Sequence, residues 1–257
     1  MDHMMKTLVM KFGGAALKTA TQFSKIAKII QDRKEKSLVV VVSAMGGFTN
    51  ALVSLAHQVA KKPSKREVDM LLSVGERVSM SLLAMVLEEE GIPAVSLTGS
   101  QSGIITSQDH GAAFIKEVRP GRVKQHLSEG KVVIVGGFQG VSEEREITTL
   151  GRGGSDTSAV ALGVALQAER VEFYKDVPGV FSKDPKKHRD AHFLSQLTFE
   201  EALSFSEFVL HKRAVLLAAK NHLPLQIKSF EEKLREECSG TWIRSKERGG
   251  TLQWESP

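Results

Sequence analysis

The chain has 257 residues, of which 41% are hydrophobic and 25% are charged, a balance that is ordinary for a soluble globular protein and enough for one large domain or two small ones. Its formal net charge of +5 comes from scattered basic residues, which suits a small anionic substrate as well as nucleic acid. The single cysteine, Cys238, excludes an intrachain disulfide and favours a reducing compartment. The apolar run 8–12 is too short for a signal peptide or a membrane span, so we expect a cytoplasmic protein.

Apolar runs that suit strands alternate with longer segments that suit helices. In chain order we expect a strand at 8–12, a helix at 21–33, a strand at 38–42, helices at 49–60 and 74–90, a strand at 94–97, an irregular stretch, a helix at 122–129, a strand at 132–135, a helix from 156 to 168, a strand at 170–174, helices at 199–206 and 211–221, and a strand at 225–227. The basic cluster 61–66 is interpreted as a solvated loop. Such alternation predicts an α/β protein, a three-layer αβα sandwich with a mostly parallel central sheet.

Glycine pairs recur near the ends of the predicted strands, at 13–14, 46–47, 136–137 and 153–154. The first three follow apolar, β-branched runs of the kind that forms strands buried on both faces. Glycine allows the backbone to approach a ligand closely, and open α/β sheets bind ligands beyond the carboxyl ends of their strands. The pairs therefore predict one rim lined with backbone N–H groups that bind phosphate.

The run Gly151-Arg152-Gly153-Gly154-Ser155-Asp156 precedes a segment with helical character. We expect Ser155 or Asp156 to cap the helix. The N–H groups of such a turn can bind an anion, and Arg152 adds donors that match a carboxylate or phosphate. The alternative is a tight strand-to-helix turn without a ligand.

Lys11 lies at the end of an apolar strand, immediately before Phe12-Gly13-Gly14. Its ammonium group either reaches solvent or lies over transferring phosphates. Phosphoryl transfer needs mainly positioning and charge neutralisation, and a carboxylate acceptor needs no general base. The sequence has no P-loop motif, no Gly-x-Gly-x-x-Gly after its first strand, no Ser-His-Asp pattern and no metal-ligand spacing of its histidines with Cys238. The acid and the lysines of segment 174–187 either surround a nucleotide or form a turn with solvated charges.

These motifs, in this order, resemble those of the aspartate kinases, which belong to the amino-acid kinase family. The resemblance spans nearly the whole chain and rests on segments 11–14, 42–50, 75–77, 137–140, 148–156, 176–185, 209–211 and 240–241. It implies transfer of the ATP γ-phosphate to the β-carboxylate of L-aspartate, giving 4-phospho-L-aspartate. This reaction is the first step towards lysine, diaminopimelate, threonine and methionine.

The resemblance also implies roles for individual residues. Lys11 and Asp156 are the implied catalytic residues: Lys11 stabilises the transferring phosphoryl group and Asp156 orients Lys11. Arg152 is expected to bind a substrate carboxylate and Glu76 the aspartate ammonium group, within a substrate-binding set of Ser43, Thr49, Glu76, Phe138, Arg152 and Ser155. The implied ATP-binding residues are Lys11, Gly13, Gly14, Gly153, Gly154, Lys175, Asp176, Phe181, Lys183, Asp184 and Lys186. Magnesium would be held chiefly by ATP oxygens and water, with no protein ligand.

The chain departs from the family pattern at several positions. Ala15 and Ala16 replace a usual Thr-Ser pair, and the other departures are Lys175 for threonine, Phe181 for tyrosine, Phe208 for lysine and Lys212 for proline. We expect one amino-acid kinase domain over 5–257, with an acceptor-binding part at about 5–150 and a nucleotide-binding part at about 151–257. Family members usually continue into ACT regulatory domains, so we expect no ACT-mediated inhibition by lysine or threonine here. A homodimer is a further expectation from the family.

Two other functions remain open at this point. The chain could be an amino-acid-family kinase with another acceptor, such as glutamate or a nucleoside monophosphate; Glu76 and Arg152 favour an amino acid. It could instead be a weakly active or inactive aspartate-binding subunit, which Phe208 and the Ala15-Ala16 pair favour. A nucleic-acid role is disfavoured because no module of aromatic and basic residues occurs.

Overall fold

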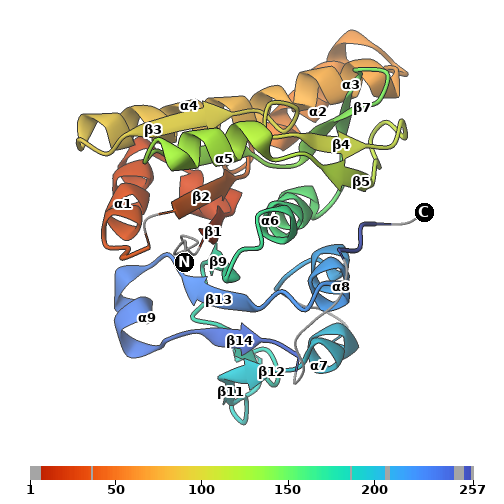
Figure 1. Ribbon diagram of the computed structural model, residues 1–257. Coiled ribbons are helices and arrows are strands. Elements are labelled where there is room, and N and C mark those ends of the chain that lie inside the picture. Colours follow the sequence, from red (N-terminus) through yellow and green to blue (C-terminus); the bar gives the residue numbers. More distant parts are fainter. Residues whose placement is uncertain (1–6, 36, 186, 206–208, 246–251, 256–257) are drawn as a thin grey trace.

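The computed structural model describes residues 7–35, 37–185, 187–205, 209–245 and 252–255. Its central strands are β1 (Thr7–Phe12), β2 (Ser37–Val42), β3 (Ala94–Leu97), β6 (Val132–Gly136), β9 (Arg170–Lys175), β12 (Gln196–Leu197), β13 (Leu225–Ser229) and β14 (Thr241–Ile243). They form one eight-stranded sheet in the order β12-β14-β13-β9-β1-β2-β6-β3 (Figure 1). Every neighbouring pair is parallel except β13 with β14. The prediction of a mostly parallel sheet is thus confirmed.

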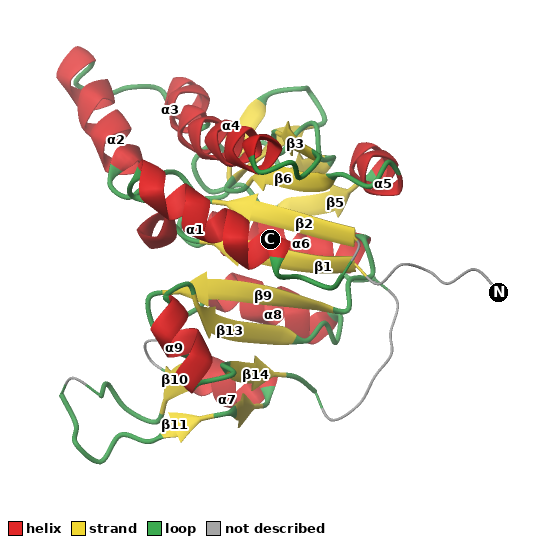
Figure 2. Ribbon diagram, turned by 90° about the vertical axis from the view of Figure 1, so that its left-hand side faces the viewer, coloured by secondary structure: helices red, strands yellow, loops and turns green. Residues whose placement is uncertain are grey.

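Helices cover both faces of this sheet (Figure 2). The residues of β2 alternate between the faces: Val40 and Val42 pack with helices α1 (Ala20–Gln31) and α4 (Val74–Glu89). Val39 and Val41 pack with α5 (Gly121–Ser128), α6 (Gly154–Ala165) and α8 (Lys212–Lys220) on the other side. Because β1 and β2 are buried along their whole length, both faces need apolar side chains, which explains their unbroken apolar runs. The three-layer αβα sandwich is confirmed.

A second, smaller sheet was not predicted: two of its strands lie in the stretch expected to be irregular, and the other two lie between the predicted strand at 132–135 and the predicted helix from 156. Its strands are β4 (Ile104–Thr106), β5 (Ile115–Val118), β7 (Gln139–Ser142) and β8 (Ile147–Thr149), in the order β5-β4-β7-β8. Figure 1 shows it beside α3 (Lys65–Leu72), near α2 (Phe48–Val59). Helix α3 was also not predicted, and it corrects our interpretation of 61–66 as a loop, because Lys65 and Arg66 already belong to its first turn. The side chain of Ser64 caps it by accepting the Glu67 N–H.

The remaining described elements are short. They are the 3-10 helix η1 (Gly14–Leu17), the antiparallel pair β10 (Val180–Phe181) and β11 (Phe193–Leu194), helix α7 (Phe199–Ser204) and helix α9 (Glu232–Glu237). The helical stretch 65–89 has the length and hydropathy of a membrane span, but half of that apolar window is buried inside the fold. Burial of this kind is typical of a core helix.

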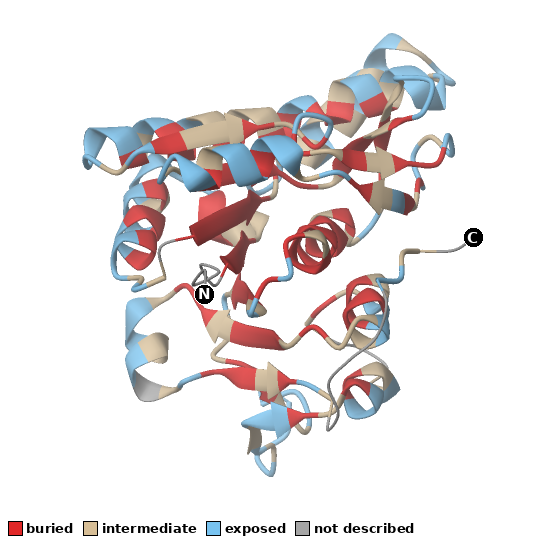
Figure 3. Ribbon diagram, viewed as in Figure 1, coloured by how far each residue is buried: buried red, intermediate tan, exposed pale blue. Residues whose placement is uncertain are grey.

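Helix α6 is buried along nearly its whole length (Figure 3). It packs against β1, β9 and α8, so the mixture of small and branched residues in its sequence needs no polar face. The prediction of its cap was wrong. The N-cap is Gly153, whose φ is 72°, and Ser155 and Asp156 lie in the first turn. Glycine occupies the cap because the chain enters the helix from the left-handed region.

Candidate active site

Several segments that are distant in sequence meet at the carboxyl edge of the central sheet. Lys11 lies near the end of β1, Ser43 follows β2, and Phe138 follows β6. Because β1, β2 and β6 are parallel, their carboxyl ends lie on one edge. The first turns of α4 and α6 add Glu76 and Asp156 at the same edge.

A buried carboxylate lies between two ammonium groups at this edge. The Asp156 Oδ1 atom is 2.6 Å from Lys11 Nζ, and its Oδ2 atom is 3.4 Å from Lys175 Nζ. Burial alone would raise the pKa of Asp156, but Lys11 and Lys175 outweigh it and lower that pKa to about 2. Burial, reinforced by the Lys11 charge, lowers the pKa of Lys175. Two cations share one anion, so the cluster keeps a positive charge that can attract an anionic group.

Glu76 is a second buried carboxylate, and it is only half satisfied. Its Oε1 atom accepts the Ala44 N–H at 3.0 Å, whereas its buried Oε2 atom has no hydrogen-bond partner among the residues that the structure describes. Burial raises the pKa of Glu76 to about 7, and the Ala44 N–H and the Lys11 charge reduce that shift only in part. A buried acceptor without a hydrogen-bond partner is unfavourable. A ligand that donates a hydrogen bond to this oxygen would remove that cost.

Residues 151–155, which are the turn after β8 and the first two residues of α6, are called the anion turn here. Gly151 and Gly153 have φ values of 70° and 72°, and the Gly154 N–H closes the turn on the Gly151 carbonyl at 3.0 Å. Phe138 also has a positive φ, of 69°, and its carbonyl accepts the Leu150 N–H at 2.9 Å. Strained backbone of this kind at a non-glycine residue is typical of functional sites.

We expect Gly153 to tolerate no side chain. A Cβ at this position would lie 2.1 Å from the His211 ring, so Gly153→Ala adds a steric clash to the strain of a positive φ. Gly130 has a φ of 75° and nothing within 4 Å of its added Cβ, which makes Gly130→Ala the matched control. Urea unfolding should show a loss of about 1 kcal/mol for the Gly130 variant and about 2 kcal/mol more for the Gly153 variant. Equal losses would show that the contact with His211 does not matter.

The edge carries a cavity of about 580 Å³. Every residue predicted as catalytic or substrate-binding lines it: Lys11, Ser43, Thr49, Glu76, Phe138, Arg152, Ser155 and Asp156, together with Gly153 and Gly154. The wall also contains residues to which the sequence assigned no role, chiefly Asp69 and Gly111. A signal for Asp69 existed, because Ser64 and Glu67 form the Ser-x-x-Glu pattern of a helix start. That pattern predicts α3 and places Asp69 and Leu72 on one face.

The residues predicted to bind nucleotide are only partly gathered at this edge. Gly13 adjoins Lys11, with its added Cβ 3.6 Å from the Nζ atom, and Lys175 contacts Asp156. Among the others, Asp176 is exposed, Phe181 packs edge-to-face on Phe193 and Lys183 pairs with Asp190. Neither these three nor Asp184 lines the cavity. Lys186 and Phe208 lie outside the described residues.

Comparison with known proteins shows the family of this chain. The sequence profile of the amino acid kinase family matches residues 6–229. The chain belongs to the amino acid kinase family. Among members of this family, an aspartokinase of Geobacillus stearothermophilus is 47% identical over 245 residues, which are 93% of this chain and 59% of that protein. This chain thus spans less than two thirds of that relative's length.

Solved structures of family members have the same fold. The aspartate kinase from Synechocystis superposes with a TM-score of 0.82 and 42% identity, over 96% of this chain and 41% of that one. Aspartokinase III of E. coli, solved in complex with aspartate and ADP, superposes with a TM-score of 0.84 and 26% identity over 95% of this chain and 65% of that one. These superpositions confirm the amino-acid kinase fold that the resemblance implied.

Proposed function

We propose that this chain transfers the γ-phosphoryl group of ATP to the β-carboxylate of L-aspartate, giving 4-phospho-L-aspartate and ADP. The observation that carries the proposal is the cavity, which combines an exposed Arg152, a buried carboxylate oxygen of Glu76 without a partner among the described residues, and Lys11 paired with Asp156, whose carboxylate also contacts Lys175. The similarity to aspartokinases over most of the chain supports it. So does the aspartate and ADP bound by the E. coli protein.

Each end of an aspartate molecule has a complementary group in this cavity. The fork of Arg152 suits a carboxylate, and the free Glu76 oxygen suits the ammonium group. The hydroxyl groups of Ser43, Thr49 and Ser155 also line the cavity. This arrangement favours an amino acid over a nucleoside monophosphate as the acceptor. An aspartate held in this way would direct its β-carboxylate towards Lys11.

The reaction itself needs no general base. A β-carboxylate oxygen, already ionised, forms a bond to the γ-phosphorus as the bond from that phosphorus to the ADP oxygen breaks. Lys11 would neutralise charge on the transferring group, and Asp156 would hold Lys11 in place. The N–H groups of Gly13, Gly14 and Gly153 would bind phosphate oxygens, next to Gly154, whose own N–H is bonded to the Gly151 carbonyl. Magnesium would supply further charge neutralisation. Lys11 and Lys175 already occupy the Asp156 carboxylate, which fits a metal held by ATP oxygens and water rather than by that side chain.

Other expectations from the family belong to the same proposal. Lys175, Asp176, Phe181, Lys183, Asp184 and Lys186 would contact the nucleotide, within a nucleotide-binding part at about 151–257 that follows an acceptor-binding part at about 5–150. A homodimer and a cytoplasmic location are proposed with it. The cavity takes residues from both parts of the chain, as a site for transfer between two substrates requires.

A hydroxamate-trapping assay tests the activity directly. Incubation with ATP, Mg²⁺, L-aspartate and hydroxylamine should yield aspartyl hydroxamate from the wild-type chain and none from Lys11→Ala. Product with glutamate but not with aspartate, or ADP release with a nucleoside monophosphate, would assign another acceptor. Aspartate binding by calorimetry without any product would support the aspartate-binding subunit instead.

A further inference from the structure

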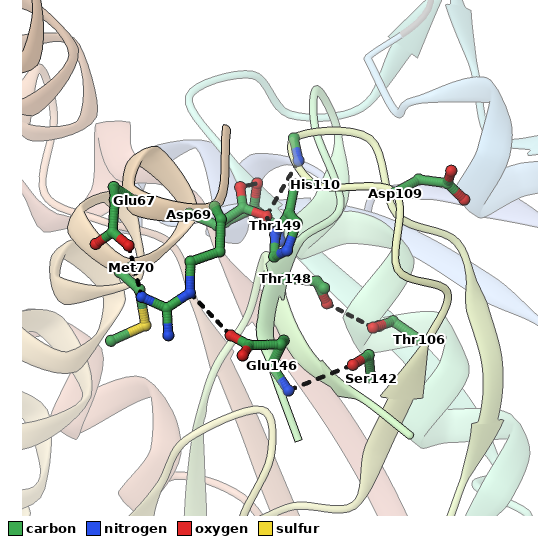
Figure 4. A network of polar contacts seen from close by, with 12 residues as sticks. Glu67, Asp69, Met70, Thr106, Asp109, His110, Ser142, Glu146, Thr148 and Thr149 are labelled. Atoms are coloured by element: carbon green, nitrogen blue, oxygen red, sulfur yellow. Dashed lines mark hydrogen bonds and ion pairs between the residues drawn. The ribbon is translucent and has the colours of Figure 1, made fainter. Parts of the chain in front are cut away.

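Asp69 is a fully buried carboxylate in the wall of the cavity. Its Oδ1 atom accepts the Thr149 hydroxyl at 2.5 Å. Its Oδ2 atom accepts three donors: the His110 Nδ1–H at 2.8 Å and the backbone N–H groups of Gly111 and Thr149, each at 3.1 Å. Figure 4 shows how Asp69, Thr149 and His110 converge from three segments. Buried charge is stable only when it is satisfied in this way.

Asp69 and Glu76 differ in what they leave free. Glu76 has a buried oxygen without a partner among the described residues, whereas both oxygens of Asp69 already accept hydrogen bonds. A substrate donor could reach Asp69 only by displacing a donor of the protein, with the loss that accompanies an unpaired buried group. Asp69 therefore has a structural role. Its hydrogen bonds join α3, the loop at 110–111 and the end of β8.

This junction lies directly before the anion turn. Thr149 is two residues before Gly151, and its carbonyl accepts the Ala113 N–H at 2.9 Å. The Gly111 carbonyl oxygen approaches Gly151 so closely that a Cβ there would be only 3.0 Å away. A displacement of the 110–111 loop or of Thr149 would thus be transmitted to Gly151 and to Arg152, the next residue.

Two other polar contacts join the end regions of α3 to the β7–β8 hairpin among the described residues: the Gln139 side-chain amide donates to the carbonyl of Ser73, the C-cap of α3, at 2.9 Å, and an ion pair joins Arg66 to Glu146. Arg66 Nε lies 2.9 Å from Glu146 Oε2, but both side chains are exposed, at 44% and 41%. Exposed ion pairs contribute little to stability, whereas several hydrogen bonds to one buried carboxylate contribute much more. The position of the hairpin end relative to α3 is therefore set by buried hydrogen bonds, the four that Asp69 accepts and the one from Gln139 to Ser73.

We propose that Asp69, His110 and Thr149 form a positioning cluster that holds the anion turn and thereby sets the affinity of the site for the carboxylate of its acceptor. The inference rests on the proposed function, because it assigns acceptor binding to Arg152. The proposal gives none of the three residues a contact with the reacting atoms. The cluster acts through the backbone of residues 149–152.

Substitutions of neighbouring threonines give a matched test. Thr149→Val removes the hydroxyl that Asp69 accepts and keeps the side-chain shape, whereas Thr149→Ser keeps the hydroxyl. Thr148→Val removes a different buried hydroxyl, one hydrogen-bonded to Thr106, and leaves Asp69 untouched. We expect Thr149→Val to raise the KM for aspartate about tenfold with the KM for ATP within twofold of wild type. Thr149→Ser and Thr148→Val should leave the aspartate KM within about twofold of wild type.

Two substitutions of His110 give a second matched test, in which one variant keeps the hydrogen bond to Asp69 and the other removes it. His110→Asn can place an N–H near the position of Nδ1, and His110→Ala cannot. The alanine variant should raise the KM for aspartate, and the asparagine variant should restore much of the loss. A parallel rise in the KM values for aspartate and ATP, or equal effects of Thr149→Val and Thr148→Val, would overturn the positioning cluster.

Hydrogen exchange separates this inference from the proposed function. Thr149→Val should speed the exchange of the amides of residues 151–155, and Thr148→Val should not. If the wild-type chain yields no aspartyl hydroxamate, the proposed activity fails, while faster exchange in Thr149→Val alone still supports the cluster. If the chain is active and exchange is unchanged in Thr149→Val, the cluster is refuted and the activity is not.

Discussion

Replacing Lys11 with methionine should lower kcat for aspartyl phosphate formation by about a thousandfold. The Lys11 side chain is buried and its Nζ atom lies 2.6 Å from Asp156, at the carboxyl end of β1 where the phosphoryl group would pass. Methionine has a similar length and no charge, so the variant removes the cation while filling most of the space. The hydroxamate assay at saturating ATP and aspartate measures the loss.

The same substitution has a cost in stability that must be separated from the loss of activity. In Lys11→Met the buried Asp156 carboxylate keeps only Lys175, at 3.4 Å, and breaking a buried pair in this way costs about 3 kcal/mol. The double variant Lys11→Met/Asp156→Asn removes both charges, so its free energy of unfolding should recover although its activity should not. If the double variant regains activity, or if Lys11→Met keeps more than roughly a tenth of kcat, the loss reflects misfolding or Lys11 is not catalytic.

The sequence predicted the central sheet well because its strands are buried on both faces. The runs Leu-Val-Met-Lys-Phe in β1 and Leu-Val-Val-Val-Val in β2 are too short for helices and too apolar for loops, and the glycines that follow mark the strand ends. The small sheet was missed because β4 and β8 have only three residues each, too few for a periodic signal. Helix α3 was missed because its first turn is basic and exposed.

Part of the candidate site could also be predicted from the sequence. Lys11, Glu76 and Arg152 each stand within two residues of a glycine that marks a strand end or a helix start, and the parallel topology brings such positions to one edge. Asp69 could not be placed in this way, because its partners His110 and Thr149 lie 41 and 80 residues further along the chain. The cap of α6 was mispredicted because the contact of Gly153 with His211, a tertiary feature, overrides the local preference for serine or aspartate.

Glu76→Gln should change how both stability and aspartate binding depend on pH. Burial raises the pKa of Glu76 to about 7 from 4.5. Between these two values the folded chain keeps a proton that the unfolded chain has lost, so the free energy of unfolding falls as pH rises, by about 3 kcal/mol in all. Above pH 7 both states have lost the proton and the effect is constant. Glutamine has no such proton, so the variant should lack this fall and be more stable than wild type at pH 8.

Aspartate binding should depend on the same proton in the opposite direction. The ammonium group of aspartate needs the ionised form of Glu76, and below pH 7 each unit of pH lowers the ionised fraction up to about tenfold. The wild-type Kd for aspartate, measured by calorimetry, should therefore rise about tenfold between pH 7.5 and pH 6, with proton release on binding. Glu76→Gln should bind aspartate weakly, with a Kd that changes little over this range.

A control on the same helix makes the result specific. Glu88 also lies on α4 but is exposed, so Glu88→Gln should follow the wild-type chain in both its unfolding and its aspartate binding at every pH. If the unfolding free energy of Glu76→Gln tracks that of wild type between pH 4.5 and 7, Glu76 is ionised throughout. If only the binding difference is missing, Glu76 is the buried acid that we describe but does not bind the ammonium group, and the acceptor's amine must bind elsewhere in the cavity.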